Sequence, residues 1–272
     1  MRFARQRGGV AGAVIVLAVA LVALLAPWLA PHPFDATDLL NTWAPPDAVN
    51  PLGTDKLGRD IASRLIVGAR ISLLVGLSVV AITLVVGVSA GMLAGFFGGL
   101  ADTLIMRVVD IVLAFPEVVL AILVAAVLGP GVATVIIALS LVWWPGIARL
   151  TRALVLVLRQ ELYVEAAIVC GTPPLIILWR HILPNIAAPL LVRASVGVGF
   201  IIMAEATLSF LGLGVQEPVP SWGSMIRDGL PALRSDPMLA VSGSVVIGLT
   251  IIGFNLLGDG LRDALDPRLH GG

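Results

Sequence analysis

Few side chains in this 272-residue sequence have the types and spacing that catalysis or metal binding requires. The three histidines, His32, His181 and His270, lie far apart and belong to no H-E-x-x-H or comparable metal-binding pattern. Cys170 is the only cysteine, which excludes a disulfide framework and a cysteine-ligated metal. The only lysine, Lys56, does not close the G-x-x-x-x-G-K-[ST] loop that cradles nucleotide phosphates. The sequence therefore predicts no catalytic residue, no metal site and no ATP site on this chain.

One serine matches a catalytic pattern. Gly87 to Gly91 read G-V-S-A-G, and G-x-S-x-G is the nucleophile elbow of hydrolases. That elbow needs a sharp strand-to-helix turn together with histidine and acidic partners. Ser89 instead lies inside a long apolar segment, and no histidine falls in any predicted membrane span. An intramembrane serine hydrolase is kept only as an alternative, which predicts labelling by a fluorophosphonate.

Two ionisable residues, Arg193 and Glu205, lie inside an apolar segment of membrane length, about 186–213. Ionisable groups at membrane depth usually face a bundle interior or a water-filled path. Both are therefore candidates for lining a pathway. For Glu205, a structural hydrogen-bonding role is an equally good interpretation.

The composition explains why polar chemistry is scarce. Hydrophobic residues make up 58% of the chain and charged residues only 12%, whereas average proteins are about a quarter charged. The formal net charge is zero, and 16 of the 17 basic residues are arginines that do not gather in one stretch, so a nucleic-acid binder is excluded. These values predict an all-α integral membrane protein.

Six apolar segments are long enough to cross a lipid bilayer. The arginines before the first segment and between later ones place both termini on the cytoplasmic side. The expected organisation is a membrane helix in 1–30, an extracytoplasmic connector in 31–70, a core of five spans in 71–258 and a cytoplasmic tail in 259–272. The six expected spans are about 10–29, 71–97, 108–128, 132–150, 186–213 and 239–257.

Two local patterns refine these expectations. In 53–73, Leu57, Ile61 and Leu65 recur every fourth residue, which predicts an amphipathic helix at the membrane interface before the second span. Within that span, glycines spaced four apart form a smooth stripe on which another helix packs closely. The stripe consists of Gly87, Gly91, Gly95 and Gly99.

The stretch 165–184 combines a loop position with an apolar composition. Gly171 suits the left-handed residue that ends a helix, and Pro173 and Pro174 suit the first turn of the next one. Pro184 is expected to stop that helix. Eleven residues give roughly 16 Å, about half of what a bilayer core requires. The helix is thus expected to fit a groove on another protein, and the alternative is a re-entrant or interfacial helix packed on its own bundle.

The motif in this stretch resembles that of a known family. The stretch resembles the EAA loop of ABC importer permeases: it has Glu165-Ala166-Ala167, then three residues, Gly171, nine further residues and His-Ile-Leu-Pro-Asn at 181–185. The His-apolar-Leu-Pro-Asn ending is similar to that of the peptide/nickel branch of this family. Residues 53–73, 208–223 and 258–267 also resemble segments of this family. The resemblance implies the type I importer permease fold with six membrane helices, in a bacterial inner membrane.

The resemblance also implies partners and site residues. It implies a second homologous permease, two ATP-binding subunits that hold ATP and magnesium, and an extracytoplasmic substrate-binding protein. It leaves open whether the substrate is a dipeptide, an oligopeptide, nickel or another small solute, and a passive channel is kept as an alternative. In the coupling loop, 159–184, the expected ATPase contacts are Glu165, Ala166, Ala167, Gly171, Leu175, Ile176, Leu178, Trp179, Arg180, His181 and Pro184.

Overall fold

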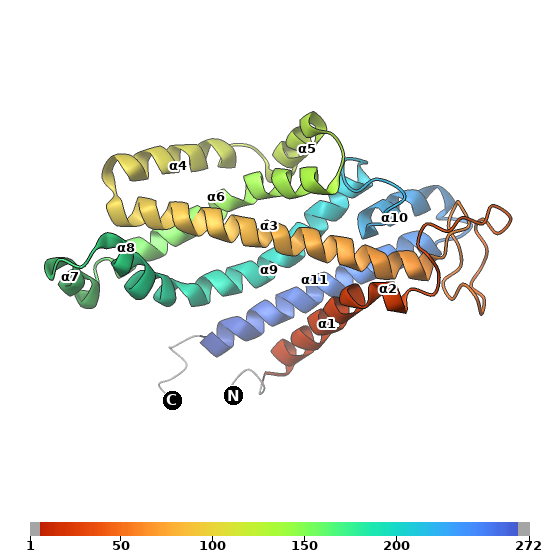
Figure 1. The fold of residues 1–272 in the computed structure, drawn as a ribbon, viewed down its shortest axis with the longest axis horizontal. Coiled ribbons are helices and arrows are strands. Elements are labelled where there is room, and N and C mark those ends of the chain that lie inside the picture. The colour runs from red at the N-terminus through yellow and green to blue at the C-terminus, as the bar shows by residue number, and fades with distance from the viewer. Residues whose placement is uncertain (1–5, 266–272) are drawn as a thin grey trace.

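The computed structural model describes residues 6–265, in which every named element is a helix (Figure 1). Arg2, Arg5 and the final part of the expected tail, 266–272, lie outside the described residues. The long helices run roughly alongside one another, and both ends of the described chain lie at the same end of the bundle (Figure 1). The main helices are α1 (Arg7–Leu24), α2 (Ala26–Leu29), α3 (Ile61–Phe97), α4 (Gly99–Leu113), α5 (Glu117–Leu128), α6 (Val132–Leu158), α7 (Leu162–Val169), α8 (Pro174–Ile176), α9 (Leu183–Phe210), α10 (Trp222–Gly229) and α11 (Met238–Leu265).

The helices agree with the expected membrane fold. In the described residues, five helical segments are long and apolar enough to cross a membrane. A sixth span results if α4 and α5 count as one, although their axes differ by 88°. The break lies at residues 114–116, where Pro116 cannot donate a backbone hydrogen bond. The third span is therefore bent and begins at Gly99 rather than near residue 108.

The glycine stripe holds α3 against α6. A Cβ on Gly91 would lie 2.5 Å from the carbonyl oxygen of Ala148, and one on Gly87 would lie 2.7 Å from the Cβ of Ile147. A Cβ on Gly95 would also overlap α6. The predicted close packing is confirmed for these three glycines. It is wrong for Gly99, which begins α4 and has no heavy atom within 4 Å of a Cβ position.

The separate interfacial helix expected in 53–73 is absent from the structure. Instead, α3 is one helix of 37 residues from Ile61 to Phe97, and the Asp60 side chain caps its first turn by accepting from the Ser63 N–H. Ser89 lies within this unbroken helix, so the strand-to-helix elbow is absent. The connector before α3 has no helix between residues 30 and 60, as its prolines predict.

Two further elements differ from the expected boundaries. The loop after α9 contains a helix, α10, which begins with a Ser221 capping box and buries Trp222, whose indole N–H donates to the Leu65 carbonyl oxygen at 3.1 Å. At the other end, α11 continues to Leu265, so the tail expected from 259 is helical through its first seven residues. The first helix packs along α11, because a Cβ on Gly12 would lie 2.4 Å from the backbone nitrogen of Leu257.

Candidate functional site

The expected coupling loop lies at one tip of the molecule, beside the ends of the bundle's long helices (Figure 1). We call this tip the α7 end, and the opposite tip, formed by residues 30–60 and α10, the connector end. Helix α7 is followed by α8 and then by a π-helical segment, Ile177–Ile182. The expected ATPase contacts thus lie in α7, in the turn after it, and in the helical segment that runs from α8 into the start of α9.

The turn between α7 and α8 is a Schellman motif centred on Gly171. The Gly171 N–H donates to the Ile168 carbonyl oxygen at 3.0 Å, and the Thr172 N–H donates to that of Ala167 at 3.1 Å. Gly171 has φ +75°, the left-handed conformation that its position predicts. No heavy atom lies within 4 Å of a Cβ position there, so only the backbone angle requires glycine.

One face of the segment after this turn is apolar and exposed. Leu175 and Trp179 are each 64% exposed, and Ile176 is 46% exposed. Together with Arg180 and Pro184 they line a surface hollow of about 490 Å³. Large apolar side chains gathered in this way mark a surface that another molecule covers.

The opposite face anchors the segment to the bundle. Ile177, Leu178 and Ile182 are buried in a cluster that includes Val155 of α6 and Val164 of α7. Leu178, one of the expected ATPase contacts, is only 3% exposed and lies on the inward side of the helix. Residues three apart share a face in a regular α-helix, so the different exposure of Leu175 and Leu178 reflects the π-helical turn that begins at Ile177.

Pro184 does not end the helix, contrary to expectation. Helical structure continues without a break from Pro174 to Phe210, over 37 residues. A wide turn precedes the proline, in which the Leu183 N–H donates to the Leu178 carbonyl oxygen, five residues back. Proline offers no N–H and crowds the carbonyl group four residues before it, and the π-helical turn accommodates both effects.

The remaining loop residues surround this segment. Glu165 and Ala166 are exposed on α7, and Ala167 is half-buried. His181 is half-buried, and its ring lies 6.4 Å from that of Tyr163. The Asn185 side chain donates to the His181 carbonyl oxygen at 2.6 Å, which ties the motif's last residue to the preceding turn.

Glu205, one of the two candidates for lining a pathway, lies in the interior of the bundle. Its side chain is fully buried, one carboxyl oxygen accepts from the Ser72 hydroxyl group at 3.0 Å, and the other accepts from Ser209 at 2.7 Å. The carboxyl group thus links α3 to α9, which matches the structural interpretation. Buried polar groups satisfied in this way stabilise one specific packing.

Arg193 lies on the surface of α9. It is exposed and lines a cavity of about 530 Å³ between α6, α9 and α11. Arg193 and Glu205 are therefore in different environments, although both are in the same helix.

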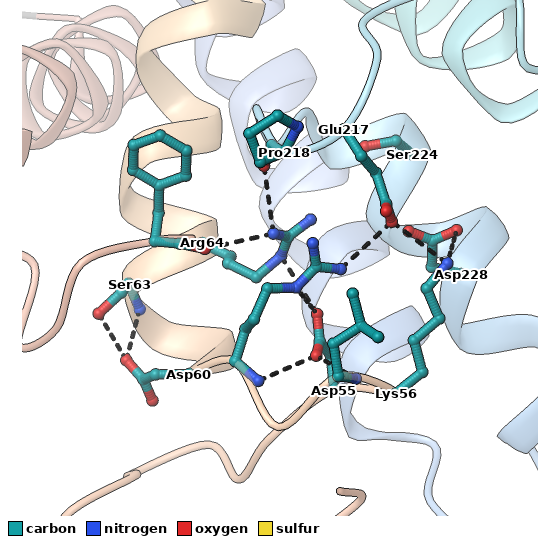
Figure 2. A network of polar contacts seen from close by, with 12 residues as sticks. Asp55, Lys56, Asp60, Ser63, Arg64, Glu217, Pro218, Ser224 and Asp228 are labelled. Carbon is teal, nitrogen blue, oxygen red and sulfur yellow. Dashed lines mark hydrogen bonds and ion pairs between the residues drawn. The ribbon is translucent and has the colours of Figure 1, made fainter. Parts of the chain in front are cut away.

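Sequence reasoning missed a second cluster, at the connector end (Figure 2). Asp55 lies at its centre, where its carboxylate accepts from the Arg59 guanidinium at 2.7 Å and lies 3.5 Å from that of Arg64. All three side chains are 2% exposed or less. Buried charges of this kind require such partners. Their pairing explains why no interfacial helix forms here: the arginines point into the protein rather than toward headgroups.

Residues from the loop after α9 complete the cluster. Glu217 accepts from Arg59 and lies 3.2 Å from Lys56, which also lies 3.2 Å from Asp228 of α10 (Figure 2). Burial alone raises the pKa of Glu217, but hydrogen bonds from Lys56 and Arg59 outweigh it and lower the pKa from 4.5 to about 2.

This arrangement has no feature of a catalytic site. It balances three cations against three anions and fastens the residues before α3 to the loop that begins more than 150 positions later. The only signal for it in the sequence is the four-residue spacing of Asp55 and Arg59. Nothing near Glu217 or Asp228 in the sequence indicates their distant partners.

Comparison with known proteins decides which family has this architecture. The family described as binding-protein-dependent transport system inner membrane component matches residues 87–271, about two thirds of the chain. The N-terminal TM domain of oligopeptide transport permease C matches residues 1–46. The chain belongs to this permease family. The resemblance to peptide-type ABC importer permeases, the six-span all-α fold and the assignment as a transport component are thereby confirmed.

Similar proteins cover nearly the whole chain. It is 44% identical to the glutathione transport system permease protein GsiD of Pectobacterium atrosepticum, over 98% of this chain and 89% of that protein. It is 41% identical to the oligopeptide transport system permease protein OppC of Bacillus subtilis, over 99% and 88%. It is 42% identical to the dipeptide transport system permease protein DppC of Alkalihalophilus pseudofirmus, over 97% and 87%.

Proposed function

We propose that this permease forms half of the translocation pathway of an ATP-driven importer for short peptides. In this proposal a second homologous permease forms the other half, two ATPase subunits bind the α7 end, and a substrate-binding protein delivers peptides at the connector end. The α7 end and both termini then face the cytoplasm of a bacterial cell, and the chain crosses the inner membrane.

One observation carries the proposal: the segment after Gly171 has one exposed apolar face and one buried face. Its outer face exposes Leu175 and Trp179, while Leu178 and Ile182 fix its inner face to the bundle. A short apolar helix surface held rigidly at a protein's tip suits insertion into a groove of a partner. Because the segment continues directly into α9, a movement of the partner reaches the membrane region through one helix.

The nucleotide belongs to the partner in this proposal. The 272 residues include one lysine, Lys56, and no P-loop, so they do not fit ATP and magnesium. The chain's contribution is mechanical: Glu165 and Gly171 set the loop geometry, and Leu175, Ile176, Trp179 and Arg180 contact the ATPase. Closing of the ATPase pair then tilts α9 between outward and inward access.

The peptide substrate is inferred from what the named relatives share. Glutathione, oligopeptides and dipeptides are all short peptides, and the relatives named for them match this chain along nearly its full length. Nickel import would need a chelate with comparable chemistry, and no relative considered above carries that name.

Copurification tests the proposal. The doubly substituted chain Leu175→Asp and Trp179→Asp is expected to reach the membrane but to lose its ATPase subunits, since two carboxylates would be desolvated in the groove. The control is Leu40→Asp, which alters a residue 95% exposed at the connector end and should retain them. A wild-type chain that purifies without any ATP-binding subunit would support a passive channel instead.

A further inference from the structure

The cavity beside Arg193 is lined by residues that have no role in the coupling mechanism proposed above. It encloses about 530 Å³, within the usual range for small-molecule sites. Residues of α9 form one wall, and residues of α6 and α11 form the sides. The residues that matter for its chemistry are Arg193, Pro189 and Val192 of α9, Leu150 of α6, and Arg262 and Leu265 of α11.

The charges in this cavity are all of one sign. Arg193 and Arg262 line it, and no aspartate or glutamate does. Within residues 6–265, neither arginine has an acidic partner within ion-pair distance. The arginines on the other side of α6 differ, because Arg149 pairs with Asp110 and Arg152 pairs with Asp102.

Two guanidinium groups without an ion-pair partner in the described part of the chain favour an anion. Each presents a planar fork of donors that matches a carboxylate or a phosphate group, and this match is strongest where water is partly excluded. Apart from Asn185, the rest of the lining is apolar and includes Leu150, Pro189 and Val192, which suits the body of an organic anion rather than an inorganic ion. A peptide carboxylate and a lipid phosphate both have this chemistry.

The location favours the peptide. The cavity wall is α9, which continues directly from the segment that the ATPase is proposed to move. In that proposal, the distance between Arg193 of α9 and Arg262 of α11 would change during each cycle. Arg193 also borders a second, much smaller space of about 20 Å³, which is lined by Thr83 of α3 and Trp143 of α6. A site whose shape would change with the position of α9 suits a passing solute rather than a resident lipid.

We propose that Arg193 and Arg262 bind the carboxylate group of the translocated peptide at the cytoplasmic end of the pathway. This inference rests on the proposed function. It assigns a substrate contact to this chain and predicts that the importer prefers peptides with a free carboxyl terminus. The two arginines bind that carboxylate group in one state of α9 and release it in the other.

Uptake by the complete importer in proteoliposomes tests the site. The initial uptake rates of trialanine and of trialanine amide are measured, and the readout is the ratio of the two rates. Because every variant is assayed with the same binding protein, that protein's own preference does not affect the comparison between variants. Arg193→Gln is expected to lower the acid-to-amide ratio about tenfold, since a charge-assisted hydrogen bond contributes about that factor. Arg193→Lys should keep most of the ratio, and the control Arg107→Gln, at an exposed arginine of α4, should keep all of it.

The outcomes separate the two proposals. If the wild-type importer takes up trialanine and Arg193→Gln keeps the wild-type ratio, the carboxylate site is wrong while the importer function stands. If the wild type takes up neither peptide, the proposed function fails and the site fails with it.

Thiol labelling gives a readout that does not depend on transport. Arg193→Cys is placed in a Cys170→Ser background, which removes the only native cysteine. In inside-out vesicles, a membrane-impermeant cationic thiol reagent should label the new cysteine, and trialanine should slow the labelling more than its amide does. Labelling only by a lipid-soluble reagent would show a lipid-filled cavity and overturn the proposal.

Discussion

Glycine at position 171 is required for its backbone angle and not for its size. The space around it is open, yet its φ is +75°. A residue with a Cβ in this conformation costs about 1–2 kcal/mol, which asparagine partly avoids. This combination permits a substitution test in which bulk and backbone strain are separated.

We expect Gly171→Leu to reach the membrane but to hydrolyse ATP with little peptide uptake, because the turn would no longer hold α8 in place. Gly171→Asn should retain most of the uptake, since asparagine tolerates the left-handed conformation. The measurement is the number of peptides taken up per ATP hydrolysed in proteoliposomes. Equal coupling in the two variants would contradict the role assigned to the turn.

Glu217 makes the stability of the connector end depend on pH. Lys56 and Arg59 lower its pKa from 4.5 to about 2, so the folded state favours the ionised form. The stabilisation is fully present above pH 4.5 and is lost as the pH falls toward 2. Other carboxylates titrate in the same range, so only a difference between variants is informative.

Thermal unfolding in detergent between pH 5 and pH 2.5 should therefore show a shallower loss of Tm for Glu217→Gln than for the wild type. The exposed Glu161, which has no ion-pair partner within residues 6–265, provides the control Glu161→Gln, whose curve should follow the wild type. Parallel curves for all three proteins would show that the ion pairs of Glu217 do not stabilise the fold.

At the scale of helices, the contact between α3 and α6 depends on small residues. Gly91→Ala should destabilise the protein by about 1–3 kcal/mol, because the added Cβ would lie 2.5 Å from the Ala148 carbonyl oxygen. Gly146→Ala, in α6, adds a methyl group where no heavy atom lies within 4 Å, and should leave stability unchanged or raise it. A lower Tm for both variants would indicate that helix geometry, not interhelical contact, sets the requirement.

Periodicity predicted the helices well and their boundaries poorly. The glycine spacing in α3 identified its packing face, and Gly171 identified the turn, because both signals are local. Pro184 was misread because its effect depends on whether the preceding turn can widen. The sequence did not reveal the continuous α3, because Arg59 and Arg64 look solvent-exposed in it. In the fold Arg59 pairs with the distant Glu217, and Arg64 pairs with the buried Asp55.

The same reasoning holds for the candidate site. Leu175 and Trp179 lie on an exposed surface, as expected. Leu178 is buried, and the sequence does not indicate this, because a π turn changes the direction in which successive side chains point and its position cannot be derived from sequence. Glu205 looked functional because it is ionisable, and its partner Ser72 lies in another helix.

At the scale of the whole molecule, orientation in the membrane follows from one residue. Cys170 is exposed in the turn after α7 and is the only cysteine in the chain. After removal of the ATPase subunits, a membrane-impermeant maleimide should label inside-out vesicles and leave intact spheroplasts unlabelled. A serine in its place, Cys170→Ser, gives the background signal. Labelling of intact spheroplasts would place the α7 end outside and reverse the proposed topology.

The unbroken helix from Pro174 to Phe210 has a consequence for how force travels. At about 1.5 Å per residue, 37 residues form a rod of roughly 55 Å, longer than a bilayer core is thick. Glu205, near its far end, is hydrogen-bonded to Ser72 of the neighbouring α3. A displacement of the segment at the α7 end would therefore tilt α9, and through Glu205 it would also move α3 on the opposite side of the membrane.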